Sequence, residues 1–479
     1  MQSQIKKVHF IGIGGVGMSG IARVAHDQGM QVSGSDLKES RYTKELRKAG
    51  VEIFIGQKAE NIPAEAPDVV VVSTAILPDN PELLEAQRRG LAIWHRAKML
   101  AELGVGRTTL AVAGTHGKTT SSSMLASTLD AMGFDPTFLI GGIVRAYHTN
   151  AHSGMGDYYV VEADESDKSF TYLNPTAVLV TNIEADHLDH YENLAEIYSL
   201  FSDFISSVPE QGVCVVCGED QPLVDLARKT GKTVYTYGAH EACDTRVVNY
   251  RTEGISTHFD VVFSNGETFA CSIKQNPGFH NALNAAGVLT LLWALGFDLA
   301  KACEKMGEFA GVRRRFDLVG QARGITIVDD YAHHPTEIAA TIEAAKALDF
   351  SHVHVIFQPH RYSRVKLFTD VLKDEFATAF DAADRVTFMN VYPAGETPVP
   401  GVSGATFLQP VLDSPSHPKQ TEYIARRMQV VSKVASQLEP GDLVITMGAG
   451  DVTAIGPELL AYLQDEKNVL PALRAEGSN

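Results

Sequence analysis

The chain lacks the long apolar segments of a membrane protein and the paired cysteines of a secreted disulfide scaffold. No run reaches the ~18 consecutive apolar residues that a bilayer-spanning helix needs. The first residues, MQSQIKKVHFIGIGG, lack the apolar core and cleavage site of a signal peptide. The five cysteines are scattered and odd in number, so they form no disulfide framework. These absences predict a soluble, cytoplasmic protein.

The chain is also poor in positive charge. It has 41 Lys and Arg against 58 Asp and Glu, which gives a formal net charge of −17. Because such a chain is repelled by phosphate backbones and anionic lipid surfaces, we expect no nucleic-acid partner and no membrane insertion. The positive charge that binds any anionic substrate must therefore be concentrated locally. Aromatic residues form no evident interface stripe, and we expect a monomer or a weak homodimer.

The pattern that is present is a short β-rich run, a glycine turn and a helix, repeated along the chain. At about 150 residues per domain, 479 residues predict roughly three domains. Continuous apolar runs such as DVVVVSTAI are typical of parallel sheets, so the predicted class is α/β. Breaks near 103–107 and 308–315 place the domains at 1–104, 105–310 and 311–479.

Two local predictions concern single stretches. From TVYTYG to ETFACSI, apolar and polar residues alternate, which predicts antiparallel strands inserted in or flanking the middle sheet. The stretch YIARRMQVVSKVASQL, residues 423–438, is interpreted as one helix.

The first glycine loop, FIGIGGVGMSG, follows an apolar run and matches G-x-G-x-x-G at Gly12, Gly14 and Gly17. The pattern suits a diphosphate held at a helix N-terminus, as in dinucleotide-binding folds. Asp36 lies 19 residues after Gly17, where an acidic residue contacts a ribose. An NAD-dependent dehydrogenase is therefore one alternative, although it leaves the other motifs without a role.

The second glycine loop, AVAGTHGKTT, places Gly114, Gly117, Lys118 and Thr119 between a strand and a Ser-rich helix start. Glycines let backbone N–H groups approach phosphates, Lys118 reaches the terminal phosphates, and the Thr119 hydroxyl ligates Mg²⁺. Val112 stands where the standard P-loop has its first glycine. The flanking strand and helix nevertheless favour ATP over a chance glycine turn.

Polar clusters follow several predicted strands, where open α/β sheets bind ligands. DYYVVEADESD supplies Glu162, Asp164, Glu165 and Asp167, and AVLVTNIEADHLDH supplies Glu184, Asp186, His187, Asp189 and His190. Because Mg²⁺ prefers oxygen ligands, Glu162 with Thr119 makes chemical sense, whereas His187 is an unusual ligand. Cys214 and Cys217 share one strand without a second pair, so we interpret them as structural rather than zinc-binding.

The third domain concentrates positive charge and histidine. Arg313, Arg314 and Arg315 form a run at the domain junction, where an arginine can stabilise phosphoryl charge. DDYAHHPTE supplies Asp330, Tyr331, His333 and His334, and FQPHRYSR supplies His360, Arg361 and Arg364. Because Arg binds carboxylates bidentately, this patch is a candidate clamp for a carboxylate substrate.

Taken together, these motifs resemble the Mur ligases, the ATP-dependent amino-acid ligases of peptidoglycan synthesis. The resemblance spans nearly the whole chain and also uses HNALNA and GVRRRFD. It implies a Rossmann-like N-terminal domain for a UDP-sugar, a central P-loop ATPase domain with a mostly parallel sheet and flanking antiparallel strands, and a Rossmann-like C-terminal domain that brings the amino acid. Within the family, GIGGVGMSG, DYAHHPTE and FQPHRYSR imply that L-alanine is joined to UDP-N-acetylmuramate through an acyl phosphate.

The resemblance also assigns site residues by motif position. It implies that ATP contacts Gly114, Thr115, His116, Gly117, Lys118, Thr119, Thr120, Asn281, Asn284 and Arg315. It implies that Mg²⁺ is held by Thr119, Glu162 and His187. It implies that the UDP-sugar contacts Gly12, Gly14, Gly15, Val16, Gly17, Asp36, Ser73, Thr74, Ala75 and His95. It implies that the amino acid contacts Tyr331, His333, His360, Arg361 and Arg364. Lys118 and Arg315 are then catalytic, with His187 or His333 as the base for the amine.

One departure from sibling ligases concerns lysine. Ligases that add later residues use a carbamylated lysine soon after the DH-x-D motif, but HLDHYENLAEIYSLFSDFI contains none, so we predict no carbamate. Two further alternatives remain: a ligase that recycles muropeptide by joining a tripeptide to the same UDP-sugar, and a non-catalytic P-loop binding protein.

Overall fold

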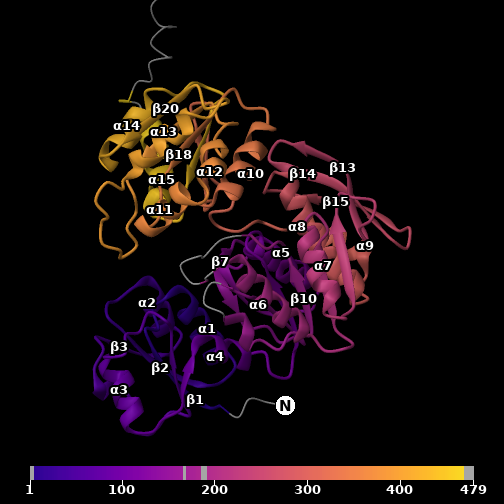
Figure 1. The fold of residues 1–479 in the computed structure, drawn as a ribbon. Coiled ribbons are helices and arrows are strands. Elements are labelled where there is room, and N and C mark those ends of the chain that lie inside the picture. Colours follow the sequence, from indigo (N-terminus) through magenta and orange to yellow (C-terminus); the bar gives the residue numbers. More distant parts are fainter. Residues whose placement is uncertain (1–4, 166–168, 185–190, 192, 466, 469–479) are drawn as a thin grey trace, which may run out of the picture. The chain divides into compact units, whose positions relative to one another are not determined.

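The computed structural model describes residues 5–165, 169–184, 191, 193–465 and 467–468, and these contain three β-sheets with flanking helices (Figure 1). The chain divides into two compact units. One comprises residues 1–249, 259–272 and 283–310, and the other comprises 250–258, 273–282 and 311–479. The α/β fold class is confirmed, while the predicted domain boundaries after residues 104 and 310 stay a prediction.

The first sheet has the strand order β3-β2-β1-β4-β5, and every pair in it is parallel. Val8 and Phe10 of β1 pack with helix α1, whereas Ile11 packs against Ala86 of α3 on the other face. The order reverses between β1 and β4, which is where open parallel sheets bind ligands. The elements are β1 (Lys7–Ile11), α1 (Val16–Asp27), β2 (Gln31–Asp36), α2 (Arg41–Lys48), β3 (Glu52–Ile55), η1 (Ala59–Asn61), β4 (Val69–Val72), α3 (Pro81–Arg88), β5 (Ile93–His95) and α4 (Arg96–Glu102).

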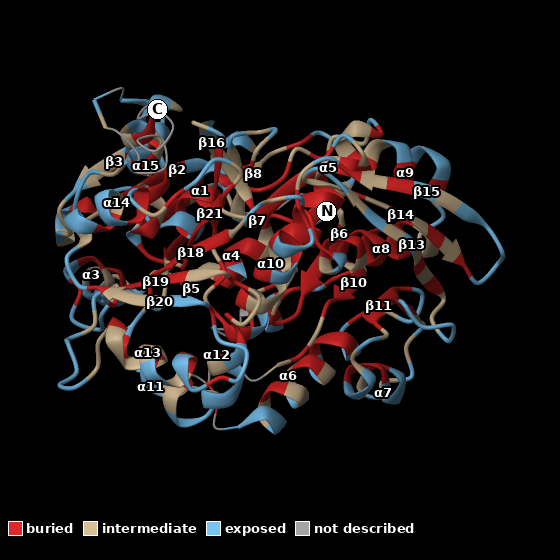
Figure 2. Ribbon diagram, turned by 90° about the horizontal axis from the view of Figure 1, so that it is seen from above, coloured by how far each residue is buried: buried red, intermediate tan, exposed pale blue. Residues whose placement is uncertain are grey.

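The second sheet has ten strands in the order β15-β14-β13-β12-β11-β10-β6-β9-β7-β8. The strands at its centre pair in parallel and are apolar. They are also buried, as Figure 2 shows for β10. The elements are β6 (Thr108–Ala113), α5 (Lys118–Ala131), β7 (Thr137–Val144), β8 (Thr149–His152), β9 (Tyr158–Glu162), η2 (Ser169–Tyr172), β10 (Ala177–Val180), α6 (Leu194–Ser206), β11 (Val213–Cys217), α7 (Gln221–Lys229), β12 (Val234–Gly238), β13 (Thr245–Glu253), β14 (Ser256–Phe263), β15 (Thr268–Ile273), α8 (Phe279–Ala294) and α9 (Leu299–Met306).

The predicted antiparallel strands are partly correct. Two residues link β13 to β14 and four link β14 to β15, and links this short join neighbouring strands only in antiparallel order. The prediction is wrong for β12, which pairs in parallel with both β11 and β13. Asp244 in the following link accepts a hydrogen bond from the Thr236 N–H at 2.8 Å. The link therefore folds back along β12, and β13 begins in the same direction.

The third sheet has the order β16-β17-β21-β18-β19-β20, in which only β16 and β17 pair antiparallel. Alternate residues of β18 enter two cores, Val355 with α10 to α13 on one face and Ile356 with α14 and α15 on the other. The elements are β16 (Asp317–Ala322), β17 (Ile325–Asp330), α10 (Pro335–Lys346), β18 (Val353–Phe357), α11 (Tyr362–Asp370), α12 (Lys373–Thr378), β19 (Arg385–Met389), η3 (Gly404–Phe407), α13 (Leu408–Leu412), β20 (Gln420–Ile424), α14 (Arg427–Ala435), β21 (Leu443–Met447), η4 (Asp451–Ala454) and α15 (Ile455–Gln464).

The single helix predicted over 423–438 is wrong at its start. Tyr423 and Ile424 end strand β20, and helix α14 spans only Arg427–Ala435. Ile424 is buried and lies opposite Met389 of β19 in parallel register. Pairing with β19 and burial of Ile424 thus outweigh the local helical pattern.

Among the residues that the structure describes, no helix is both long and apolar enough to cross a membrane.

Candidate active site

The first glycine loop is held in shape by the end of β2. The N–H groups of Gly12 and Ile13 both donate to the Ser35 carbonyl at 2.9 Å, and the Gly14 N–H donates to the Asp36 carboxylate at 2.9 Å. Gly12 has φ +79°, and a Cβ at Gly14 would lie 2.8 Å from the Asp36 carboxylate, so neither position suits a side chain. Gly15 then caps the N-terminus of α1, an end that attracts anions.

The other predicted UDP-sugar residues follow neighbouring strands. Ser73, Thr74 and Ala75 come directly after β4, and His95 ends β5. Because β1, β4 and β5 are adjacent and parallel, these residues and the glycine loop share the carboxyl edge of one sheet.

Three more features of this edge bear on the predicted UDP-sugar site. Val16 is 47% exposed at the start of α1. His95 also caps α4, because its Nδ1 accepts a hydrogen bond from the Ala97 N–H at 3.4 Å. The sequence prediction omitted Arg96, whose Nη1 lies 3.5 Å from where a Gly17 Cβ would be. This places a guanidinium beside the expected diphosphate position.

The second glycine loop is shorter than a standard P-loop. Val112 pairs with Glu162 inside the sheet, so the loop begins only at Gly114. Gly114 and Gly117 have φ of +128° and +83°, conformations that favour glycine. Helix α5 begins directly afterwards at Lys118, and Thr120 is buried in its first turn. The missing first glycine is therefore explained by β6 continuing through Val112.

Lys118 is held inside the loop by three acceptors. Its Nζ donates to the Gly114 carbonyl at 2.5 Å, to the Thr115 carbonyl at 3.2 Å and to the Glu165 carboxylate at 2.9 Å. Burial lowers the pKa of Lys118, but the nearby carboxylates, Glu165 foremost, more than offset this and raise it overall. Lys118 is therefore a fixed positive charge at the N-terminus of α5.

Glu165 is the acidic partner that the sequence prediction did not include among the site residues. Burial raises its pKa to about 7, although the Lys118 ammonium opposes that shift. Glu165 and Lys118 thus form a buried ion pair beside the loop.

Thr119 and Glu162 come together, as predicted. The Thr119 hydroxyl donates to Glu162 Oε1 at 2.9 Å, and the Gly141 N–H donates to Oε2 at 2.6 Å. Burial raises the pKa of Glu162, although these hydrogen bonds and Lys118 oppose it. A hydroxyl and a carboxylate are the oxygen donors that Mg²⁺ prefers, so these two residues fit the ion.

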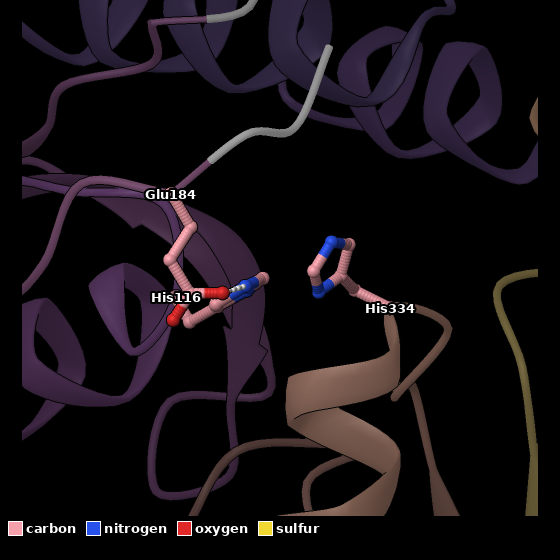
Figure 3. Close-up of side chains that lie close together, drawn as sticks. All are labelled: His116, Glu184 and His334. Carbon is pink, nitrogen blue, oxygen red and sulfur yellow. Dashed lines mark ion pairs between the residues drawn. The ribbon is translucent and has the colours of Figure 1, made fainter. Parts of the chain in front are cut away.

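The middle of the second glycine loop is hydrogen-bonded to the segment that follows β10. The His116 N–H donates to the Asn182 side chain at 2.8 Å, and the Thr115 hydroxyl accepts a hydrogen bond from the Glu184 N–H at 2.8 Å. His116 Nε2 lies 3.4 Å from a Glu184 carboxylate oxygen, the contact drawn as a dashed line in Figure 3. Asn182 was not among the predicted site residues. Its position just after an apolar strand would have indicated it as a candidate.

Asn281 and Asn284 both lie on α8, three residues apart. Asn284 packs against the P-loop, since a Cβ at Gly117 would lie 2.7 Å from its Oδ1. Asn281 instead donates to the Pro277 carbonyl at 2.9 Å. Asn284 thus contacts the loop directly, and the role of both asparagines near the adenine stays a prediction.

In the second unit, Tyr331 and His333 follow β17. The Arg315 guanidinium lies 5.4 Å from the Tyr331 ring centre and 3.6 Å from Glu337. His333 Nδ1 lies 3.0 Å from the Tyr331 carbonyl and 3.3 Å from Glu337. Both neighbours are acceptors, so a neutral His333 carries its proton on Nδ1 and has Nε2 as its basic nitrogen.

His360, Arg361 and Arg364 follow β18 at the same edge of the third sheet. Strand β21 lies between β17 and β18, so the two groups of predicted residues are separated by two strand spacings, about 10 Å. His360 stacks on Tyr392 with ring centres 5.7 Å apart. Its Nδ1 is buried and has no hydrogen-bond partner among the residues described. The structure thus places both groups at one edge of the sheet, on strands that are not neighbours.

His360 gives a pH-dependent prediction for stability. Burial, reinforced by Arg364 and Arg361, lowers its pKa from 6.5 to about 4. As pH falls, the unfolded chain takes up this proton at a higher pH than the folded protein does. The free energy of unfolding is therefore undiminished above pH 6.5 and decreases as pH falls towards 4. We expect the melting temperature of wild type, relative to His360→Gln, to fall by a few degrees between pH 7 and pH 4.5 in thermal scans. A constant difference across this range would contradict the assignment.

His187, predicted as a metal ligand and candidate base, lies outside the described residues, as do Asp167, Asp186, Asp189 and His190.

Three family models match successive parts of the chain. They are described as the Mur ligase family catalytic domain over residues 7–107, the Mur ligase middle domain over 112–292, and the Mur ligase glutamate ligase domain over 314–450. Together they span most of the chain.

Similar proteins match along the whole length. A UDP-N-acetylmuramate–L-alanine ligase of Carboxydothermus hydrogenoformans is 42% identical over 95% of this chain and 96% of its own, and one of Brucella anthropi is 44% identical over the same shares. A solved UDP-N-acetylmuramate-alanine ligase from Thermotoga maritima is 29% identical, covers 96% of this chain and 99% of its own, and has a TM-score of 0.78. A murein peptide ligase from Psychrobacter arcticus is 25% identical, covers 96% and 98%, and has a TM-score of 0.67.

Proposed function

The chain belongs to the Mur ligase family, and from this membership we infer that it is the ATP-dependent ligase that joins L-alanine to UDP-N-acetylmuramate in peptidoglycan synthesis. The observation that carries this function is identity of 42–44% along nearly the full chain to ligases of that name. The murein peptide ligase from Psychrobacter arcticus has a lower TM-score, 0.67 against 0.78 for the Thermotoga maritima ligase. A dehydrogenase is not favoured.

The reaction needs activation, because a carboxylate does not react with an amine. The γ-phosphoryl group of ATP moves to a lactyl carboxylate oxygen of UDP-N-acetylmuramate, which gives an acyl phosphate and ADP. The neutral alanine amine then attacks the carbonyl carbon; the C–N bond forms, the C–O bond to phosphate breaks, and the nitrogen loses a proton. Positioning and charge neutralisation supply most of the catalysis in such phosphoryl transfers.

For the ATP site, we propose that Lys118 and the N–H groups of the 114–117 loop hold the phosphates. The three acceptors around Lys118 support this, because they fix its charge at the helix N-terminus. Thr119 and Glu162 supply oxygen ligands for Mg²⁺, which adds positive charge beside the phosphates when bound. Arg315 is proposed to stabilise phosphoryl charge.

We propose that the UDP-sugar binds at the Gly12–Gly17 loop, at the residues that follow β4 and at His95, which ends β5. The support is the loop's shape at the N-terminus of α1. Asp36 already accepts a hydrogen bond from Gly14, so its first role is to hold the loop.

For alanine, we propose that His360 and Arg364 hold the carboxylate and that Tyr331, His333 and Arg361 lie nearby. The buried Nδ1 of His360, which has no hydrogen-bond partner within the described part of the chain, supports a ligand there. We propose His333 as the base. Its Nδ1 faces two acceptors, so the proton of the amine would go to Nε2.

An amino-acid panel tests the function. Purified full-length protein is mixed with ATP, Mg²⁺, UDP-N-acetylmuramate and one of L-alanine, glycine, L-serine, L-glutamate or the tripeptide L-alanyl-γ-D-glutamyl-meso-diaminopimelate, and phosphate release is followed. We expect L-alanine to give the highest kcat/KM. Glycine lacks only one methyl group, so its kcat/KM is expected to be lower by roughly 10- to 100-fold.

Omitting UDP-N-acetylmuramate is the control, and phosphate release should then fall to background. A higher kcat/KM with the tripeptide than with L-alanine would assign the chain to muropeptide recycling. Tight NADH binding in a fluorescence titration would revive the dehydrogenase alternative.

A further inference from the structure

A buried carboxylate behind the first glycine loop belongs to none of the predicted site residues. Glu82 lies in the first turn of α3, and its exposed fraction is 0%. His9 of β1 and Ser35 of β2 are also fully buried around it. An acidic side chain at this depth is costly unless its oxygens are hydrogen-bonded, so its partners indicate what it does.

Glu82 uses both of its oxygens to join strands β1 and β2 with the 58–61 segment that follows β3. Oε1 accepts from the Lys58 N–H at 3.2 Å and from the Asn61 side chain at 2.9 Å. Oε2 accepts from the Ser35 hydroxyl at 2.9 Å and contacts His9 Nε2 at 2.9 Å. Three of the four partners donate to Glu82, and the α3 N-terminus adds a favourable dipole, so the pocket suits a carboxylate.

The first route from Glu82 to the glycine loop runs through Ser35. The Ser35 side chain binds Glu82, while the Ser35 carbonyl accepts the N–H groups of Gly12 and Ile13. Any shift of Ser35 therefore moves the first two amides of the loop.

The second route reaches the next residue of β2. Asn61 binds Glu82 and donates to the Gly56 carbonyl at 2.8 Å, and the Gly56 N–H donates to the Asp36 carbonyl at 2.8 Å. Asp36 in turn accepts the Gly14 N–H. Both routes thus converge on the two residues that hold Gly12–Gly14.

We propose that Glu82 is a positioning residue for UDP-N-acetylmuramate: it fixes Ser35 and Asp36 and, through them, the Gly12–Gly14 turn that leads into the N-terminus of α1, where the diphosphate is proposed to bind. This proposal rests on the proposed function of the loop. Glu82 touches no substrate, and its effect on the ligand is transmitted by the backbone of the β2 end.

The direct test is Glu82→Gln in the full-length protein. The amide keeps the size of the carboxylate but loses its charge and one of its two acceptor oxygens, which weakens the hydrogen bonds that hold Ser35 or Asn61 in place. We expect the dissociation constant and the KM for UDP-N-acetylmuramate to rise roughly 10-fold, while kcat and the KM for ATP stay within about 2-fold. A purely structural role would lower the active fraction, and therefore kcat, without changing that KM.

Ser33 and Ser35 supply a matched pair on one strand. Each hydroxyl bonds within the same buried network, Ser33 to His9 at 2.9 Å and Ser35 to Glu82, but only the Ser35 carbonyl binds the loop. We expect Ser35→Ala to raise the dissociation constant for UDP-N-acetylmuramate about 3- to 5-fold and Ser33→Ala to leave it unchanged. This pair decides the question if Glu82→Gln does not fold.

A second control is Asp442→Asn, another fully buried acid, which contacts His352 and His354 in the third sheet. It should lower the melting temperature without changing UDP-N-acetylmuramate binding in calorimetric titrations. Equal dissociation constants for wild type and Glu82→Gln, or equal effects of the two serine variants, would overturn the proposal. A wild type that binds UDP-N-acetylmuramate but shows no alanine-dependent turnover would instead refute the ligase function.

Discussion

Replacing Lys118 with alanine lowers alanine-dependent phosphate release roughly 100- to 1,000-fold, while UDP-N-acetylmuramate still binds with a nearly unchanged dissociation constant. The reason is that Lys118 is a fixed positive charge at the start of α5, buried among the Gly114 and Thr115 carbonyls and Glu165. Without it, the charge that develops on the transferred phosphoryl group loses a fixed cation of the loop. Phosphate release and calorimetry on the same preparation measure both quantities.

Lys301 is the matched control for this variant. It also donates from Nζ to a backbone carbonyl, that of Met132 at 2.9 Å, and it belongs to the same unit of the chain. Lys301→Ala should retain wild-type turnover. Turnover of Lys118→Ala within a few-fold of wild type would remove the P-loop assignment. Loss of UDP-N-acetylmuramate binding in Lys118→Ala would indicate misfolding instead, and circular dichroism would detect it.

Glu162→Gln is expected to lower turnover roughly 100-fold and to raise the Mg²⁺ concentration needed for half-maximal rate. Glutamine keeps an oxygen that can accept a hydrogen bond from Gly141 or Thr119, so the local fold is preserved. The negative charge that attracts the cation is lost, and Mg²⁺ binds neutral amides more weakly than carboxylates. Initial rates measured across a Mg²⁺ titration test both expectations.

Glu219→Gln serves as the comparison. Glu219 likewise accepts a short backbone hydrogen bond, from the Ala239 N–H at 2.6 Å, and has no proposed role in the reaction. It should leave the Mg²⁺ dependence unchanged. If Glu162→Gln and wild type have the same Mg²⁺ dependence, Glu162 is not a metal ligand.

The local features of the phosphate loops were determined by the sequence alone. Gly12, Gly114 and Gly117 take positive φ, a conformation that side chains disfavour, so a strand followed by such glycines and a helix predicts a loop at a helix N-terminus. Thr119 follows the loop after β6 and Glu162 ends β9, and these two could be paired because parallel strands end at one edge. Whole-chain motif order was enough to indicate the family.

Only the tertiary structure decided which residues hold those loops. Glu82, 68 positions after Gly14 in the sequence, is connected to it through Ser35 and Asp36, and no periodicity of α3 signals a buried acid. The order of the strands likewise set β21 between β17 and β18, which separates His333 from His360. Long-range pairing also made residues 423 and 424 a strand. Backbone conformation depends on neighbours in sequence, whereas hydrogen-bond partners and strand order depend on neighbours in space.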